Sequence, residues 1–129
     1  MPTTGQYFRT TLKQAHLEWG SHRHTNTRGI RYGEGYLQIP APDAYNCEIT
    51  NDKEPARSQV YNFSTSDGFI TNGRLKASGN QAQEKYAKQF HGDGNLQLLG
   101  DWFYHIDAQI GDEIEIKFIS PTDILLTKI

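Results

Sequence analysis

The sequence predicts a mainly β fold with two short helices, and patterns in three places support this class. Residues 113–119 alternate charged and apolar side chains, as expected of a half-buried strand. A second apolar run at 124–129 follows the turn-forming residues 120–123, so the chain is expected to close with a β-hairpin. Upstream, Asp67-Gly68 and Asn72-Gly73 are dipeptides that tolerate the positive φ angles of hairpin turns. The members of the first run expected to face the core are Ile114, Ile116 and Phe118.

The length of 129 residues predicts a single domain. A chain of this size buries about two-thirds of its unfolded surface without help from disulfides or metals. Aromatic residues make up 12% of the chain and can supply much of the core area. Residues 1–9 are polar and turn-rich, and we expect them to form a loose arm. Cys47 is the single cysteine, so an internal disulfide is excluded.

The first half of the chain predicts little regular structure. Residues 10–18 fit one helical face poorly, and we interpret them as a strand that ends near Trp19. Residues 20–35 hold four glycines and almost no apolar side chain, which indicates a long loop. Residues 36–40 predict a strand that Pro40 must end or leave at a sheet edge, and residues 42–46 predict one helical turn.

The middle of the chain predicts a β-meander. Residues 59–65 alternate, although Val60 and Tyr61 both compete for the inward face. After the first of the two hairpin dipeptides we expect a short strand at 69–71, and after the second a strand at 74–77.

Two further elements precede the closing hairpin. Residues 81–90 contain helix-forming residues, with Ala82, Tyr86 and Phe90 at a spacing of four, and predict the second short helix. Residues 95–103 are expected to form a short aromatic turn.

The net charge of −2 conceals an uneven distribution along the chain. Segments 19–33 and 70–92 each carry a net charge of +3, whereas 34–69 carries −4 and 93–129 carries −5. A polyanionic partner responds to the local potential of the face it meets more than to the net charge. The two basic segments therefore indicate a candidate surface for a polyanion, although each segment alone is also compatible with an ordinary solvated surface.

The loop at 20–35 is long enough to suggest a function, because loops of this length inside compact domains are usually functional or disordered. It is rich in arginine, histidine, asparagine and threonine, which contact phosphates and base edges, and in glycine, which lets a backbone approach closely. A mobile surface loop without function remains the alternative. In the second basic segment, asparagine and glutamine can pair bidentately with adenine, and lysine suits phosphate or guanine.

Catalytic and metal-binding patterns are weak. Glu115-Ile116-Lys117 matches part of a metal-dependent nuclease pattern, but alternation places these charges on an outward face of a strand. The five histidines lack zinc-finger or H-E-x-x-H spacing, Cys47 has no neighbouring histidine, and no nucleophile elbow or phosphate loop occurs. We expect neither an enzyme nor a cofactor or metal site, with a small metal-dependent nuclease as the remaining catalytic alternative.

The sequence contains no apolar leader and no apolar run of about 20 residues. We therefore expect a soluble cytoplasmic protein that does not associate with membranes.

The order and spacing of several short motifs resemble a known family. The motifs are Leu17-Glu18-Trp19-Gly20, Gly35-Tyr36-Leu37-Gln38-Ile39-Pro40-Ala41-Pro42, Ser66-Asp67-Gly68, Ala77-Ser78-Gly79-Asn80-Gln81, Trp102-Phe103 and Gly111-Asp112. Together they resemble the B3-type DNA-binding pseudobarrel, most closely the version fused to the catalytic part of phospholipase D-type restriction endonucleases. The resemblance covers roughly residues 16–129.

This resemblance implies an open seven-stranded β-barrel that grips the DNA major groove with two arms. By position, the N-terminal arm corresponds to 19–34 and the C-terminal arm to 78–94, which include most of the two basic segments. The H-x-K motif of phospholipase D enzymes does not occur, so a nuclease would have to be a separate or fused partner.

We therefore expect a sequence-specific reader of double-stranded DNA without catalysis of its own. In the N-terminal arm we assign base-edge contacts to His22, His24 and Asn26 and phosphate or guanine contacts to Arg23 and Arg28. Thr27 and Arg31 are further DNA-binding candidates in this arm. In the second basic segment we assign a phosphate or guanine contact to Lys76 and a backbone contact to Lys88. The base-edge candidates of the C-terminal arm are Asn80, Gln81, Gln83 and Lys85, and Ser78 is a further DNA-binding candidate. The alternative is a protein- or carbohydrate-binding barrel with an aromatic platform of Trp19, Tyr32 and Tyr36.

Overall fold

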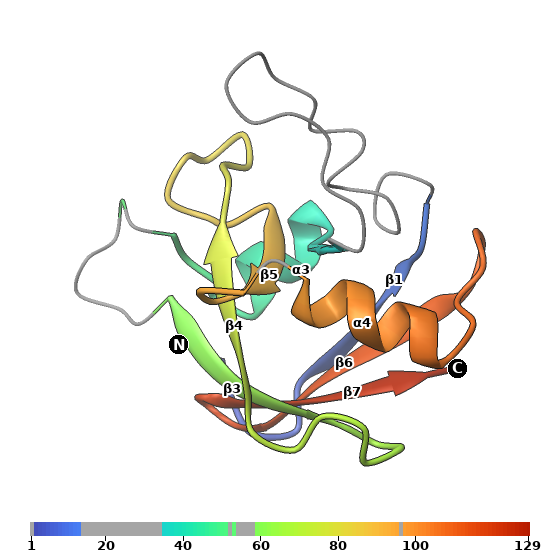
Figure 1. Ribbon diagram of the computed structural model, residues 1–129. Coiled ribbons are helices and arrows are strands. Elements are labelled where there is room, and N and C mark those ends of the chain that lie inside the picture. Colours follow the sequence, from blue (N-terminus) through green and yellow to red (C-terminus); the bar gives the residue numbers. More distant parts are fainter. Residues whose placement is uncertain (1, 14–34, 52, 54–58, 96) are drawn as a thin grey trace.

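A computed structural model describes residues 2–13, 35–51, 53, 59–95 and 97–129 of the chain. These residues form seven strands and two helices, arranged as a nearly closed barrel (Figure 1). The strands are β1 (Tyr7–Thr11), β2 (Leu37–Gln38), β3 (Val60–Thr65), β4 (Gly73–Ser78), β5 (Gln89–Gly92), β6 (Glu113–Ser120) and β7 (Asp123–Lys128). The helices are α3 (Ala41–Asn46) and α4 (Leu98–His105). The expected mainly β class, with seven strands and two short helices, is confirmed.

The strand order β1-β6-β7-β3-β4-β5-β2 divides the sheet into two antiparallel groups. β1, β6 and β7 form one group, and β3, β4, β5 and β2 form the other. The two groups meet where β3 pairs in parallel with β7, in a register that sets Asn62 opposite Asp123 and Thr65 opposite Leu126. This single parallel pair makes one continuous barrel out of two antiparallel sheets.

The barrel interior follows the alternation of the strands. In β6 the three apolar side chains at alternate positions are fully buried, as the sequence predicts, and the closing β6–β7 hairpin is confirmed. In β3 the competition between Val60 and Tyr61 is resolved in favour of Tyr61, which is 2% exposed. Its ring packs edge-on against Phe90 of β5 and Phe118 of β6, with centroid distances of 5.7 and 5.8 Å. The Tyr61 ring thus connects three strands through the core.

The helix α3 lies where one helical turn is expected. It begins directly after Pro40, and Pro42 occupies the first turn, where its missing N–H costs nothing. Ala44 is buried on its inner side.

The helix α4 replaces the aromatic turn expected at 95–103, and that expectation is wrong. Leu99, Trp102 and Phe103 are spaced three and four residues apart, which places them on one face of a helix, and all three are buried. The helical spacing of these three residues is present in the sequence.

The helix expected at 81–90 is also wrong. Residues 79–88 form an irregular loop between β4 and β5, which we call the β4–β5 loop, and Gln89 already belongs to β5. Tyr86 forms an isolated antiparallel bridge with Thr50, and the N–H of Ala87 donates to the carbonyl of Ile49. Hydrogen bonds to a distant segment therefore override the local helix propensity.

The structure corrects two further expectations, one for residues 7–9 and one for residues 69–71. Residues 7–9, assigned to a loose arm, form the first part of β1, which pairs antiparallel with β6. The strand expected at 69–71 is not formed, because Thr65 and Ile70 close a loop through the backbone bond from the N–H of Thr65 to the Ile70 carbonyl. Most of the strand expected at 10–18 lies outside the described residues.

Asp67 links the β3–β4 loop to α4. Its carboxylate accepts hydrogen bonds from the Thr65 hydroxyl (2.6 Å), the Phe69 N–H (2.9 Å) and the Trp102 indole N–H (2.9 Å). Burial acts to raise the pKa of Asp67, but these three hydrogen bonds and the nearby His105 outweigh it and hold the pKa below the ordinary value. Asp67 therefore connects the β3–β4 loop to α4 in addition to its place in the turn.

Neither helix of the described residues has the length and apolar content that a membrane crossing requires.

Gly92 provides a test of the β5–α4 connection. A Cβ atom at this position would lie 2.0 Å from the Asn95 carbonyl oxygen, so Gly92→Ala must displace backbone. We expect a loss of about 3 kcal/mol in the free energy of unfolding, the upper end of ordinary overpacking costs. Chemical denaturation measures this loss in the free energy of unfolding. At Gly94, which has φ of +73° but open space around the added Cβ, the alanine variant should lose only about 1–2 kcal/mol. Equal losses at both positions would contradict the steric argument.

Candidate nucleic-acid interface

The β4–β5 loop extends beyond the ends of the two strands it joins (Figure 1). Its base is closed by backbone hydrogen bonds from the Lys88 N–H to the Ser78 carbonyl (2.9 Å) and from the Ile39 N–H to the Lys88 carbonyl (2.8 Å). The second bond ties the loop to the residue that follows β2. The loop therefore starts from a fixed base on two neighbouring strands.

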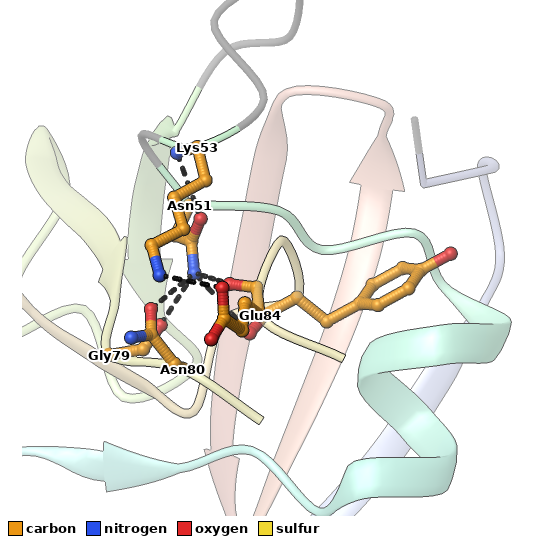
Figure 2. A network of polar contacts seen from close by, with 6 residues as sticks. Asn51, Lys53, Gly79, Asn80 and Glu84 are labelled. Carbon is orange, nitrogen blue, oxygen red and sulfur yellow. Dashed lines mark hydrogen bonds and ion pairs between the residues drawn. The ribbon is translucent and has the colours of Figure 1, made fainter. Parts of the chain in front are cut away.

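Asn51 holds the middle of the loop from inside (Figure 2). Its side-chain nitrogen lies 2.7 Å from the Gly79 carbonyl, 2.6 Å from the Glu84 carbonyl and 3.0 Å from the side-chain oxygen of Asn80. Its backbone N–H also donates to the Lys85 carbonyl at 2.9 Å. Because Asn51 is only 2% exposed, water does not compete freely for these contacts.

The importance of Asn51 was missed in the sequence, where it falls in a polar break between strands. The partners of its side-chain nitrogen are 28 to 35 residues away along the chain, so no local pattern identifies them. The burial of Asn51 is visible only in the structure, so the sequence offered no signal for its role.

Gln81 forms a second internal attachment. Its side-chain nitrogen donates to the Ile39 carbonyl at 2.7 Å and to the Ala87 carbonyl at 3.2 Å. A glutamine amide has two hydrogens, and both are occupied by these acceptors. In this structure Asn80 and Gln81, both base-contact candidates, therefore help to shape the loop, with the Asn80 NH₂ group still available as a donor.

The remaining candidates of the loop point to solvent or lie at its base. Gln83, Lys85 and Lys88 are exposed, and the Lys85 ammonium lies 5.4 Å from the centroid of the Tyr86 ring. Lys76 is half-buried on β4 opposite His91 of β5. The hydroxyl of Ser78 is buried and has no hydrogen-bond partner among the described residues.

The charge of the loop is dominated by lysines. Glu84, its one acid, forms an ion pair with Lys53 at 3.2 Å. Lys76, Lys85 and Lys88 form no ion pair with any residue of the described ranges. A polyanion approaching this end of β4 would therefore meet ammonium groups that no described carboxylate neutralises.

The N-terminal arm lies outside the described residues, as do all of its candidate side chains. These are His22, Arg23, His24, Asn26, Thr27, Arg28 and Arg31. The chain is fixed on both sides of the segment. Leu12 is fully buried, and Gly35 packs so closely on α4 that a Cβ would lie 2.8 Å from the Phe103 ring.

The weak catalytic patterns occupy structural positions. Glu113 and Glu115 lie 3.8 and 4.0 Å from Arg9 on the neighbouring strand, as an outward-facing charge cluster. Burial, reinforced by the negative charge of Asp43, raises the pKa of the Cys47 thiol to about 11, so the thiolate is scarce at neutral pH. The described part of the chain contains no group of three or more potential metal ligands.

Comparison of the chain with protein-family models, curated proteins and solved structures gives no match.

Removing the Asn51 side chain should release the loop. Asn51→Ala removes the donor of the partly buried hydrogen bonds to the Gly79 and Glu84 carbonyls, and at about 0.5–1.5 kcal/mol per hydrogen bond we expect a loss of about 1–3 kcal/mol in the free energy of unfolding. Hydrogen exchange should accelerate at the N–H groups of Gln81 and Lys88. The matched control is Asn46→Ala at an exposed position of α3, which should change neither quantity. Unchanged exchange in the Asn51 variant would contradict the proposed attachment.

Proposed function

We propose that this protein binds double-stranded DNA sequence-specifically, with the β4–β5 loop as one of two arms that enter the major groove. The N-terminal arm at 19–34 supplies the second. The domain has no catalysis of its own in this proposal. It acts in the cytoplasm as the recognition part of a restriction-type system, with a separate or fused nuclease as its partner.

The observation that carries this proposal is the internally held loop. Asn51 and Gln81 satisfy backbone carbonyls on the inner side of the loop, so its outer side chains need not contribute to its shape. A loop already fixed in one conformation loses less conformational entropy on binding than a flexible one. Such a loop can hold several side chains in a defined arrangement against a groove.

The exposed side chains have the chemistry that DNA contacts require. The amide of Gln83 can pair bidentately with the N6 and N7 positions of adenine. Lys85 and Lys88 can neutralise phosphates, and Lys85 could instead reach guanine. Asn80 retains a donor for a base edge, whereas Gln81 acts through the shape of the loop in this proposal.

The two classes of contact predict different effects of substitution. Gln83→Ala should cost about 1–3 kcal/mol on the preferred sequence and relax the preference at one base position. Lys88→Ala should weaken binding to all sequences alike and reduce the salt slope by about one. Fluorescence anisotropy with matched duplexes measures both. The controls are Gln109→Ala and Lys117→Ala at exposed positions outside the loop, and effects of equal size in these controls would refute the assignment.

Salt dependence separates DNA binding from the aromatic-platform alternative. If five phosphates are neutralised, log K should fall with log salt with a slope of about −4 to −5. Binding of a neutral oligosaccharide on aromatic rings should hardly respond to salt. A titration of duplex DNA at several salt concentrations gives the slope, and a slope near zero would argue against the phosphate contacts.

A further inference from the structure

A second surface lies at the opposite end of β4 from the β4–β5 loop. The β3–β4 loop (residues 66–72) and α4 border an open hollow of about 690 Å³, lined by Phe69, Gly100, Asp101, Tyr104 and His105. The six residues of β4 span roughly 20 Å at about 3.3 Å per residue, so this hollow is well separated from the proposed DNA-binding loop.

The hollow presents aromatic rings to solvent. Tyr104 is 91% exposed and Phe69 is 45% exposed. The Phe69 ring stacks on His105 with a centroid distance of 4.1 Å and an angle of 14° between the rings. The backbone of Phe69 is held by Asp67, which also accepts from the indole of Trp102 on α4. At least the Phe69 ring is therefore held in place and does not depend on a ligand for its position.

The two segments that contribute residues to the hollow are acidic in sequence. Segments 66–72 and 93–112 together contain five aspartates and no lysine or arginine. One of them, Asp101, is exposed and lines the hollow itself. Lys128 of β7 forms an ion pair with Asp112 at 3.5 Å, and Asp112 follows the C-terminal end of α4 in the chain. This charge repels nucleic acid and attracts a cation.

We propose that this hollow binds an arginine side chain of a partner protein. A guanidinium group stacks on aromatic faces and donates to a carboxylate in the same plane, and the hollow offers exposed rings together with the Asp101 carboxylate. A lysine ammonium lacks the planar face for stacking and the fork of donors. The site requires no DNA, so it stands or fails independently of the proposed function.

The test uses the full chain, labelled with ¹⁵N, and the peptide acetyl-Gly-Arg-Gly-amide. We expect saturable shifts of the backbone signals of Phe69, Asp101 and Tyr104 and of the Trp102 indole N–H. The matched peptide with glutamine in place of arginine should give none, and the lysine peptide should bind at least about fivefold more weakly.

Substitutions then separate the site from general charge attraction. Asp101→Asn and Tyr104→Ala change exposed side chains, and each should weaken binding of the arginine peptide at least about fivefold. Asp107→Asn removes the same charge outside the hollow, and Tyr7→Ala removes an exposed ring on β1, so both should bind as the unaltered chain does. The proposal is overturned if the arginine peptide produces no saturable shifts, if Asp107→Asn weakens binding as much as Asp101→Asn, or if the glutamine or lysine peptide binds equally well. It is also overturned if duplex DNA shifts these signals in place of the peptide.

Discussion

The parallel pairing of β3 with β7 is the constraint on which the architecture depends. Every other ladder in the described sheet is antiparallel, so without this pair the chain would consist of two separate antiparallel sheets. The pair joins them with their apolar faces on one interior, where Tyr61 of β3 meets rings from β5 and β6. It also fixes the direction of β4, because β4 is antiparallel to β3. The positions of the loops at the two ends of β4 follow from that direction.

The two ends of β4 differ in chemistry and in the way they are held. At its C-terminal end the β4–β5 loop is held by the amides of Asn51 and Gln81 and presents lysine side chains and one glutamine. At its N-terminal end the β3–β4 loop is held by the carboxylate of Asp67 and presents aromatic and acidic groups. In both cases polar side chains connect segments that are far apart in the sequence. The barrel thus serves as a rigid support for two surfaces of opposite charge.

Sequence reasoning identified the elements whose signals are local. The alternation of β6 and the turn before β7 are sufficient to predict the closing hairpin, and the strand expected at 36–40 is present as the shorter β2, which ends two residues before Pro40. It failed where contacts between residues far apart in the sequence determine the local structure. Residues 81–90 favour a helix in isolation, yet their backbone pairs with Ile49 and Asn51, and the parallel register of β3 with β7 leaves no mark on either strand. The expected arm at 78–94 starts directly before the loop but extends through β5, because charge and composition are visible in sequence and strand pairing is not. The internal partners of Asn80 and Gln81 are likewise not visible in the sequence.

The central claim is that the barrel reads a DNA sequence, and selection from a pool of randomised duplexes tests it most directly. Successive rounds of binding to the full chain, carried out at two salt concentrations, should enrich one short motif that persists at the higher salt, because base contacts depend less on salt than phosphate contacts do. Retention of duplexes without any enriched motif would mean that the loop binds phosphate without reading bases. Failure to retain duplex DNA at either salt concentration would contradict the account.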